Sequence, residues 1–242
     1  MGKSLTSSRS SASRGRRSPN NRRQVASARV EREAPIPLTA DESTIDNGSA
    51  WYVYLLPLFD CTAFKVGFSC NPLQRIFTFS RRYFERFDLD QALLLRTNNC
   101  DDARLVEAEL KRALADHRVD SPGWVLPEAG GYTEWFSAVH FSDACGQLNR
   151  RSTASDPSSL LNGSDFIRAT LAEFVGSFET WVCDQALRVC ADANSVSLGY
   201  EPTISSASLR DWLDAYRYFD IAIFKDDPEA LEFVTKSARR SV

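Results

Sequence analysis

The sequence has no run of eighteen apolar residues, and its first basic residues are not followed by an apolar stretch. A transmembrane helix needs a span of about that length, and a secretory signal peptide needs a shorter apolar segment after its positive charges. We therefore expect a cytoplasmic protein that makes no contact with a membrane.

The sequence also lacks the residue spacings that are typical of zinc sites. Its six cysteines form no C-x-x-C pair, and its two histidines, His117 and His140, form no H-x-x-x-H pair. These spacings are the usual sign of a structural or catalytic zinc ion. We expect reduced thiols that lie mostly in the core, and no zinc site of this kind.

Charge is distributed unevenly along the chain. Residues 1–30 hold eight basic residues and no acidic one, which leaves 21 basic against 32 acidic residues elsewhere, a net charge of −11. Because this segment is rich in Ser and Asn and poor in large apolar residues, we expect residues 1–49 to form a disordered basic tail and a linker. An arginine-rich tail can hold phosphates without sequence preference. A solubilising or mistranslated extension and a transit peptide are the alternatives.

The chain has 242 residues, of which 43% are hydrophobic and 25% charged, and this composition suits a globular protein of one or two domains. Two β-rich runs, 51–57 and 63–68, flank a short turn and predict a hairpin. Residues 91–96 predict a third strand. We therefore expect an α/β domain over residues 50–149, built on a small three-stranded antiparallel sheet.

One helix is expected before the third strand in the sequence and another after it. Asn71-Pro72 is typical of a helix start, with a capping side chain followed by proline at the first helical position. A second helix is expected from Asp101 or Asp102, with Leu105 and Leu110 among its inward-facing residues.

The carboxy-terminal part predicts a different structure. Residues 150–163 are rich in Ser and Asn and are expected to be a linker, and residues 164–242 are expected to be helical. One long amphipathic helix would start at Ser164 or Asp165, a second at Ser208, and a short third at Asp227-Pro228. Their aromatic stripes need a cover, which could be the first domain, the helices themselves, a second copy or another protein.

Several short motifs of the first domain follow one another at a characteristic spacing. Tyr52-Val53-Tyr54 and Lys65-Val66-Gly67 lie on the two strands of the expected hairpin, and Arg75 follows in the next helix. Glu107 lies in the later helix, and Glu134-Trp135-Phe136 closes the segment. Together these motifs resemble the GIY-YIG nuclease superfamily, with the first tripeptide in place of Gly-Ile-Tyr and the second in place of Tyr-Ile-Gly. The resemblance covers residues 50–141 and is to the branch whose second motif begins with lysine.

The resemblance implies a metal-dependent DNA endonuclease. Hydrolysis of a phosphodiester needs a deprotonated nucleophile, a cation near the developing charge and a metal at the leaving oxygen. Tyr54 would be the general base toward water, with the pKa of its phenol lowered from about 10 by Lys65 on the same face of the hairpin. Arg75 would hold the phosphate, and Glu107 would hold one Mg²⁺ or Mn²⁺. Glu109 and Glu134 are rivals of Glu107 for the metal.

A second group of basic residues follows the Arg75 helix. Arg81, Arg82 and Arg86 alternate with aromatic residues, a mixture that suits a phosphate-facing surface with aromatic packing beneath it. With Arg75 they are the expected nucleic-acid contacts. A solvated helix face is the alternative explanation.

Three functions therefore stay open. The first is DNA cleavage through Tyr54, Lys65, Arg75 and Glu107, with RNA not excluded as substrate. The second is a DNA-binding module that has lost cutting because Lys65 replaces a tyrosine. The third is a structural or regulatory protein that works through its carboxy-terminal helices, either as a homo-oligomer or with a protein partner. A fold alone does not establish a reaction.

Overall fold

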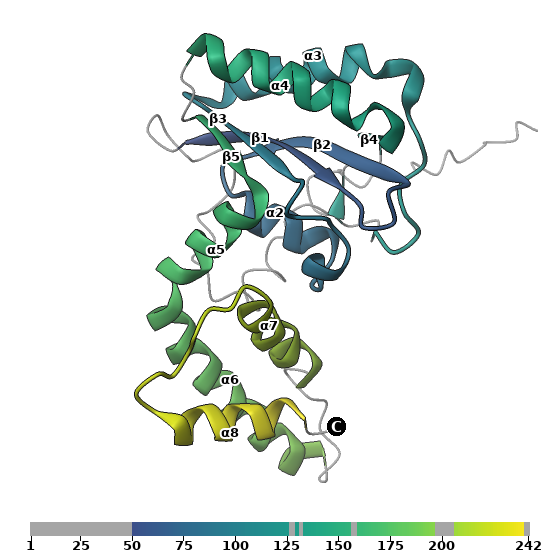
Figure 1. The fold of residues 1–242 in the computed structure, drawn as a ribbon. Helices are drawn as coiled ribbons and strands as arrows, with labels where there is room; N and C mark the ends of the chain where they lie inside the picture. The colour runs from purple at the N-terminus through teal and green to yellow at the C-terminus, as the bar shows by residue number, and fades with distance from the viewer. Residues whose placement is uncertain (1–49, 126–128, 131–132, 156–158, 197–205, 240–242) are drawn as a thin grey trace, which may run out of the picture.

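The computed structural model describes residues 50–125, 129–130, 133–155, 159–196 and 206–239. The expected basic tail over residues 1–49 lies outside the described residues. Within them, the chain forms one five-stranded sheet in the order β4-β2-β1-β3-β5, and every neighbouring pair is antiparallel. Figure 1 shows helices on both faces of this sheet. The α/β class is confirmed, but the sheet is larger than expected.

The strands are short except for the central hairpin. Their bounds are β1 Trp51–Pro57, β2 Ala63–Ser69, β3 Leu93–Thr97, β4 Trp135–Ser137 and β5 Leu160–Asn162. The predicted hairpin is confirmed, since β1 pairs with β2 from Tyr52 opposite Ser69 to Pro57 opposite Phe64. Its turn is held by the Asp60 carboxylate, which accepts hydrogen bonds from the backbone N–H and the hydroxyl of Thr62.

One face of the sheet is covered by α3 (Cys100–Ala113) and α4 (Phe141–Ser155) (Figure 1). Alternate strand residues Val53, Leu55 and Val66 point into this layer, where Leu110 of α3 and Leu148 of α4 bury the other side of the core. The start of α3 differs from the expectation, because Asn99 caps it by accepting from the N–H of Asp102. Leu105 was expected to face inward and is 56% exposed, so that expectation is wrong.

The other face is covered by α2 (Pro72–Phe79) and the start of α5 (Gly163–Glu173), and the remaining carboxy-terminal helices lie beyond these two, farther from the sheet (Figure 1). Asn71 caps α2 as expected, by accepting from the N–H of Gln74. The later helices are α5 Gly163–Glu173, α6 Val175–Val196, α7 Ser206–Tyr218 and α8 Pro228–Ala238. In place of the single helix expected from residue 164, the structure has two helices, α5 and α6, which meet at Phe174. Asn162 caps α5 by accepting from the N–H of Asp165.

The expected linker over residues 150–163 is not a linker in the structure. It contains the last turns of α4 and all of β5, whose residues pair with β3 from Leu93 opposite Asn162 to Leu95 opposite Leu160. The chain then passes so close to the sheet that a Cβ built on Gly163 would lie 2.5 Å from the Cβ of Ala92. The predicted boundary between two domains is therefore crossed by the sheet itself.

The carboxy-terminal helices find their cover on the first domain and on one another. The ring of Trp212 in α7 stacks on Phe77 of α2 with 4.8 Å between centroids, and Phe178 of α6 stacks on Tyr216 of α7 at 4.0 Å. These residues belong to one apolar cluster that continues to Tyr54 and Leu56 on the sheet. Among the helices described here, none is both long enough and apolar enough to cross a membrane.

Candidate functional site

Tyr54 lies in the middle of β1, opposite Gly67 of β2, and is 1% exposed. Its ring covers the glycine so closely that a Cβ built on Gly67 would lie 2.5 Å from the Cζ atom of Tyr54. Paired strand residues and those two positions away share one face of a sheet, so Tyr54, Gly67 and Lys65 are on the same face, as expected.

Lys65 is buried in β2, where it lies between Leu56 of β1 and Trp135 of β4 and is 1% exposed. Its Nζ donates to Oε2 of Glu134 at 2.9 Å, and lies 5.8 Å from the ring centroids of both Phe79 and Trp135. Burial lowers the pKa of Lys65 to about 8, although the hydrogen bond and charge of Glu134 oppose this effect.

Glu134, which immediately precedes β4, is the centre of the charged group. Besides Lys65, the hydroxyl of Thr133 donates to its Oε1 at 3.0 Å, and Nζ of Lys111 lies 3.5 Å from the same oxygen. Burial acts to raise the pKa of this carboxyl, but Lys65, Thr133 and Lys111 outweigh burial and hold the pKa at about 2. Glu134 is therefore ionised at neutral pH.

Glu107 joins the group from α3. Lys111 follows Glu107 by one helical turn, and its Nζ donates to Oε2 of Glu107 at 3.2 Å. The four side chains alternate in charge along a continuous series, which runs Lys65, Glu134, Lys111, Glu107. Helix α3 holds its two members in place because Leu110, one residue before Lys111, is buried against the sheet.

Arg75 approaches the same group from α2. Its Nη1 donates to the backbone carbonyl of Ala129 at 2.6 Å, and its guanidinium lies over the ring of Phe79 at 4.8 Å. The charge of Arg75 acts to lower the pKa of Lys65, as one positive charge does near another. Gly130, next to the carbonyl that holds Arg75, has a φ of +67°, which glycine adopts without strain.

The structure thus brings Lys65, Arg75 and Glu107 together, with Tyr54 on the same face of the hairpin as Lys65. Lys111 was missed as a member of the site. The i, i+4 spacing of Glu107 and Lys111 on one helix was a signal for their contact, but the contact of Lys111 with Glu134 joins segments that are distant in sequence. Glu109, a rival for the metal, pairs with Arg151 of α4 instead.

The three arginines after α2 differ in their surroundings. Arg82 is bound by Glu85 and by two carboxylates of α7, Asp211 at 3.0 Å and Asp214 at 2.9 Å. Hydrogen bonds, first with Glu85 and then with the aspartates, raise the pKa of Arg82. Its guanidinium therefore joins α7 to the first domain. The structure directs Arg82 to carboxylates and not, as expected, to a surface for nucleic acid.

Arg86 is exposed and lies over the ring of Trp124 with 5.5 Å to the centroid, while Arg81 is partly exposed. The aromatic residues between the arginines, Tyr83, Phe84 and Phe87, are buried, as the alternating pattern predicts. That Arg81 and Arg86 contact nucleic acid stays a prediction.

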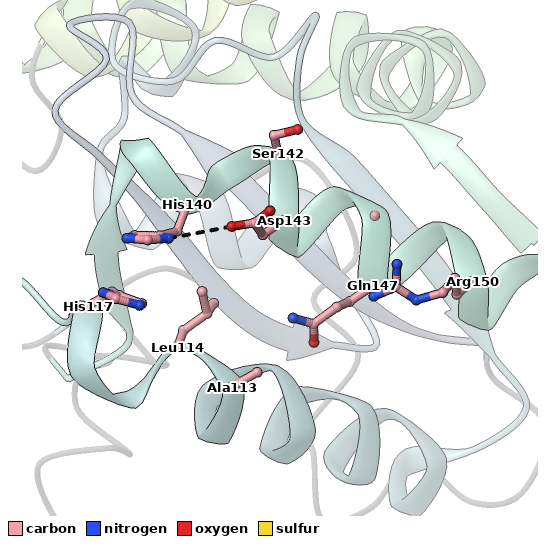
Figure 2. Close-up of a pocket in the computed structure, with 9 residues that line it drawn as sticks. Ala113, Leu114, His117, His140, Ser142, Asp143, Gln147 and Arg150 are labelled. Carbon is pink, nitrogen blue, oxygen red and sulfur yellow. Dashed lines mark ion pairs between the residues drawn. The ribbon is translucent and has the colours of Figure 1, made fainter.

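The two histidines of the chain meet in a separate pocket. His117 and His140 stack with 3.5 Å between ring centroids, and Nδ1 of His140 lies 3.5 Å from Oδ2 of Asp143. Figure 2 shows these rings at one end of a groove between α3 and α4, with Gln147 and Arg150 toward the other end. Their contact was not evident from the sequence, where they are 23 residues apart.

The carboxylates of Glu107 and Glu134 around Lys111 are the candidate ligands for the expected metal. No group of three or more His, Cys, Asp or Glu side chains is placed to hold a metal ion in the part of the chain that the structure describes. Glu107 and Glu134 do present hard carboxylate oxygens to one point, the Nζ of Lys111. Mg²⁺ is commonly held by one or two carboxylates, with water and substrate phosphate completing its shell. In the structure, however, Lys65, Lys111 and Thr133 already pair with these two carboxylates, so the described arrangement does not itself form a metal site.

Comparison with known proteins gives no relative. No protein-family model matches the chain, and neither a curated protein nor a solved structure shows significant similarity to it.

Proposed function

We propose that this chain is a metal-dependent endonuclease of the GIY-YIG type that hydrolyses phosphodiester bonds in DNA. The observation that carries the proposal is the convergence of Lys65, Arg75 and Glu107 from β2, α2 and α3 on one group of charges. These residues were selected by the spacing of their motifs, and they come from three different elements. Lys65 contacts Glu134 directly, Glu107 is linked to it through Lys111, and the charge of Arg75 acts on Lys65, which supports a common site.

Each side chain has a role that its chemistry suits. Arg75 presents a planar guanidinium whose Nη1 is fixed by the carbonyl of Ala129, which orients the remaining donors for phosphate. Tyr54 is the proposed general base and Lys65 the cation near it. Glu107, with Glu134 beside it, would hold Mg²⁺ or Mn²⁺, and the bound ion would supply charge at the leaving oxygen.

The non-catalytic DNA-binding module is a second candidate, and one observation favours it. The ammonium of Lys65 is directed to Glu134 at 2.9 Å, and Tyr54 is 1% exposed, so that both groups are deeper than a base that meets water requires. Such a module would keep Arg75 and the exposed Arg86 for phosphate and would not cleave.

The test is a plasmid nicking and cleavage assay in Mg²⁺ or Mn²⁺ with the purified chain and the variants Glu107→Gln and Arg75→Ala. We expect both variants to lose at least about a hundredfold in rate, as removal of a charge-stabilising group does. Glu109→Gln is the matched control, since Glu109 is on the same helix and pairs with Arg151. An RNA of the same sequence would distinguish the substrates.

Two results would contradict the nuclease. One is wild-type protein that binds DNA in fluorescence anisotropy and does not cleave it with either metal, which would favour the binding module. The other is cleavage that survives Glu107→Gln and Arg75→Ala unchanged, which would place the activity elsewhere. Protein with neither binding nor cleavage would leave the third hypothesis, an interaction protein.

A further inference from the structure

A line of contacts connects Lys65 of the proposed site with the exposed Arg86. The Nζ of Lys65 lies 5.8 Å from the ring centroid of Trp135, which stands opposite it on β4. Trp124 meets the ring of Trp135 edge-on, with 6.2 Å between centroids. The guanidinium of Arg86 lies over Trp124, 5.5 Å from the ring centroid. Arg86 and Trp124 therefore lie at the border of the proposed site and are joined to it by contact.

This line of contacts runs from the interior to the solvent. Lys65 and Trp135 are buried. Trp124 packs against the apolar cluster that includes Trp135 and is partly exposed, and Arg86 is exposed. Gly123, which precedes Trp124, is also exposed, and a Cβ built on it would meet nothing within 4 Å. The indole and the guanidinium on it therefore border open space.

Trp124 is held in a fixed orientation. Its ring stands nearly perpendicular to two buried rings, those of Phe87 at 82° and Trp135 at 87°. The next residue, Val125, is buried, and its N–H donates to the carbonyl of Pro122 at 3.0 Å, which closes the turn around Trp124. Because an indole has few rotatable bonds and this one is packed, a ligand that stacks on it loses little free energy to ordering of the side chain.

Arg86 differs from Arg82 in what its guanidinium meets. Arg82 is bound by three carboxylates, one of which belongs to Glu85, the residue before Arg86. Among the described residues no ion pair includes Arg86, whose planar group lies on an indole instead. A guanidinium in this position can stack on a further planar group, and its N–H donors are directed outward at its edge, where they suit a phosphate.

We propose that Arg86 and Trp124 form a stacking platform for one unpaired base of a DNA strand whose phosphates approach the proposed site. Unpaired bases stack on aromatic side chains and on guanidinium planes, whereas a base within a duplex is already stacked between its neighbours. The platform therefore selects a single-stranded segment beside the phosphate that Arg75 holds. This inference rests on the proposed function for the identity of the partner, but it does not require cleavage.

Fluorescence anisotropy of the full chain with two labelled strands separates stacking from phosphate contact. One strand is a single-stranded DNA, and the other has the same length and the same phosphates but abasic residues throughout. We expect the wild type to bind the DNA strand at least about fivefold more tightly than the abasic strand, because stacking of a base on an aromatic side chain changes affinity by about that factor or more.

Two variants assign the platform. Trp124→Leu removes the ring, and Arg86→Lys keeps the charge but removes the planar group. We expect each variant to lose at least about fivefold in affinity for the DNA strand, and to bind the abasic strand and a blunt duplex as the wild type does. Trp124→Phe, which keeps a ring, should retain most of the affinity.

Arg104→Lys is the matched control. Arg104 lies over the ring of Phe68 at 5.9 Å, which makes the same kind of pair, but it belongs to α3 on the other face of the sheet. We expect it to bind both strands with wild-type affinity. Circular dichroism and thermal melting monitor folding, and Arg86→Lys, a substitution at an exposed position, keeps the test decisive if Trp124→Leu unfolds.

The inference is overturned if the wild type binds neither strand, or binds the DNA strand and the abasic strand equally. It is also overturned if Trp124→Leu and Arg86→Lys weaken both strands by the same factor, which would indicate a contact with phosphate alone. The cleavage assay is read separately. Stacking without cleavage would contradict the nuclease and keep the platform, whereas cleavage with unchanged binding in both variants would do the reverse.

Discussion

Two groups of charged side chains join distant segments of this chain, and their cations differ in burial. The side chain of Lys65 is 2% exposed, whereas that of Arg82 is 34% exposed. Burial lowers the pKa of Lys65, while hydrogen bonds with Glu85 and then with α7 raise the pKa of Arg82. A guanidinium with several carboxylates suits a structural link, but a deeply buried ammonium is costly, and perturbed groups of this kind cluster at functional sites.

Glu134→Ala is expected to cause the largest loss of stability, and it therefore distinguishes the Lys65 group from the Arg82 group most clearly. It leaves the ammonium of Lys65 buried without its carboxylate, and loss of one partner of a buried pair costs about 3–5 kcal/mol of unfolding free energy. Urea denaturation measures this difference. Glu85→Ala is the control from the Arg82 group. Glu85 is half exposed and we expect a change of about 1 kcal/mol or less. Equal losses in the two variants would contradict the distinction.

Gly67→Ala tests how tightly the site is packed. The added methyl overlaps the ring of Tyr54, and overpacking of this kind costs about 1–3 kcal/mol. We also expect the fluorescence or ultraviolet absorbance of the aromatic core to change, because Tyr54 must move. Gly123→Ala is the control, since a Cβ there meets nothing within 4 Å. A Gly67→Ala chain as stable as wild type would show that the hairpin is looser than described.

Acid should weaken the charged group around Lys65, because it protonates the carboxylate of Glu134. Its pKa in the folded chain is about 2, below the ordinary value of 4.5. The ionised carboxyl therefore contributes stability that is fully present above about pH 4.5 and is lost as the pH falls toward about 2. With a discount for solvent screening we expect about 1–2 kcal/mol. The measurement is the difference in unfolding free energy between wild type and Glu134→Gln at about pH 5 and about pH 3. A difference that is constant with pH would refute the shift.

The smallest effect is expected from Arg82→Met, which removes the charged link to Asp211 and Asp214. Because that group is partly exposed, we expect a loss of about 1 kcal/mol of unfolding free energy. DNA binding should stay within about twofold of wild type, because this guanidinium faces carboxylates. Arg86→Met is the comparison for binding. A large loss of DNA affinity in Arg82→Met alone would return Arg82 to the nucleic-acid surface.

Local signals in the sequence predicted the local parts of this structure. The hairpin followed from two β-rich runs around a turn, and the start of α2 followed from Asn71-Pro72, because each pattern acts through neighbours in the chain. The spacing of Lys65, Arg75 and Glu107 also led to residues whose charges act on one another in the structure. Their chemistry stays a proposal.

Long-range partners explain what the sequence did not reveal. Strands β4 and β5 have three residues each, too few for a period-2 pattern, and β5 follows a Ser-rich segment that is typical of a linker. What makes them strands is pairing with β2 and β3, which are distant in sequence. Likewise Lys111 is an ordinary helix lysine until the fold brings Glu134 beside it.

The short edge strands β4 and β5 affect how copies of this chain can associate. In the sheet that the structure describes, β4 and β5 are the edges, and an edge strand is the usual template for unwanted pairing with another chain. Three residues offer an incoming strand few backbone hydrogen bonds, so both edges are poor nuclei for strand addition. If copies of this chain associate, we expect them to do so through side chains of their helices, and we expect β1, which pairs with β2 on one side and β3 on the other, to resist growth into fibrils.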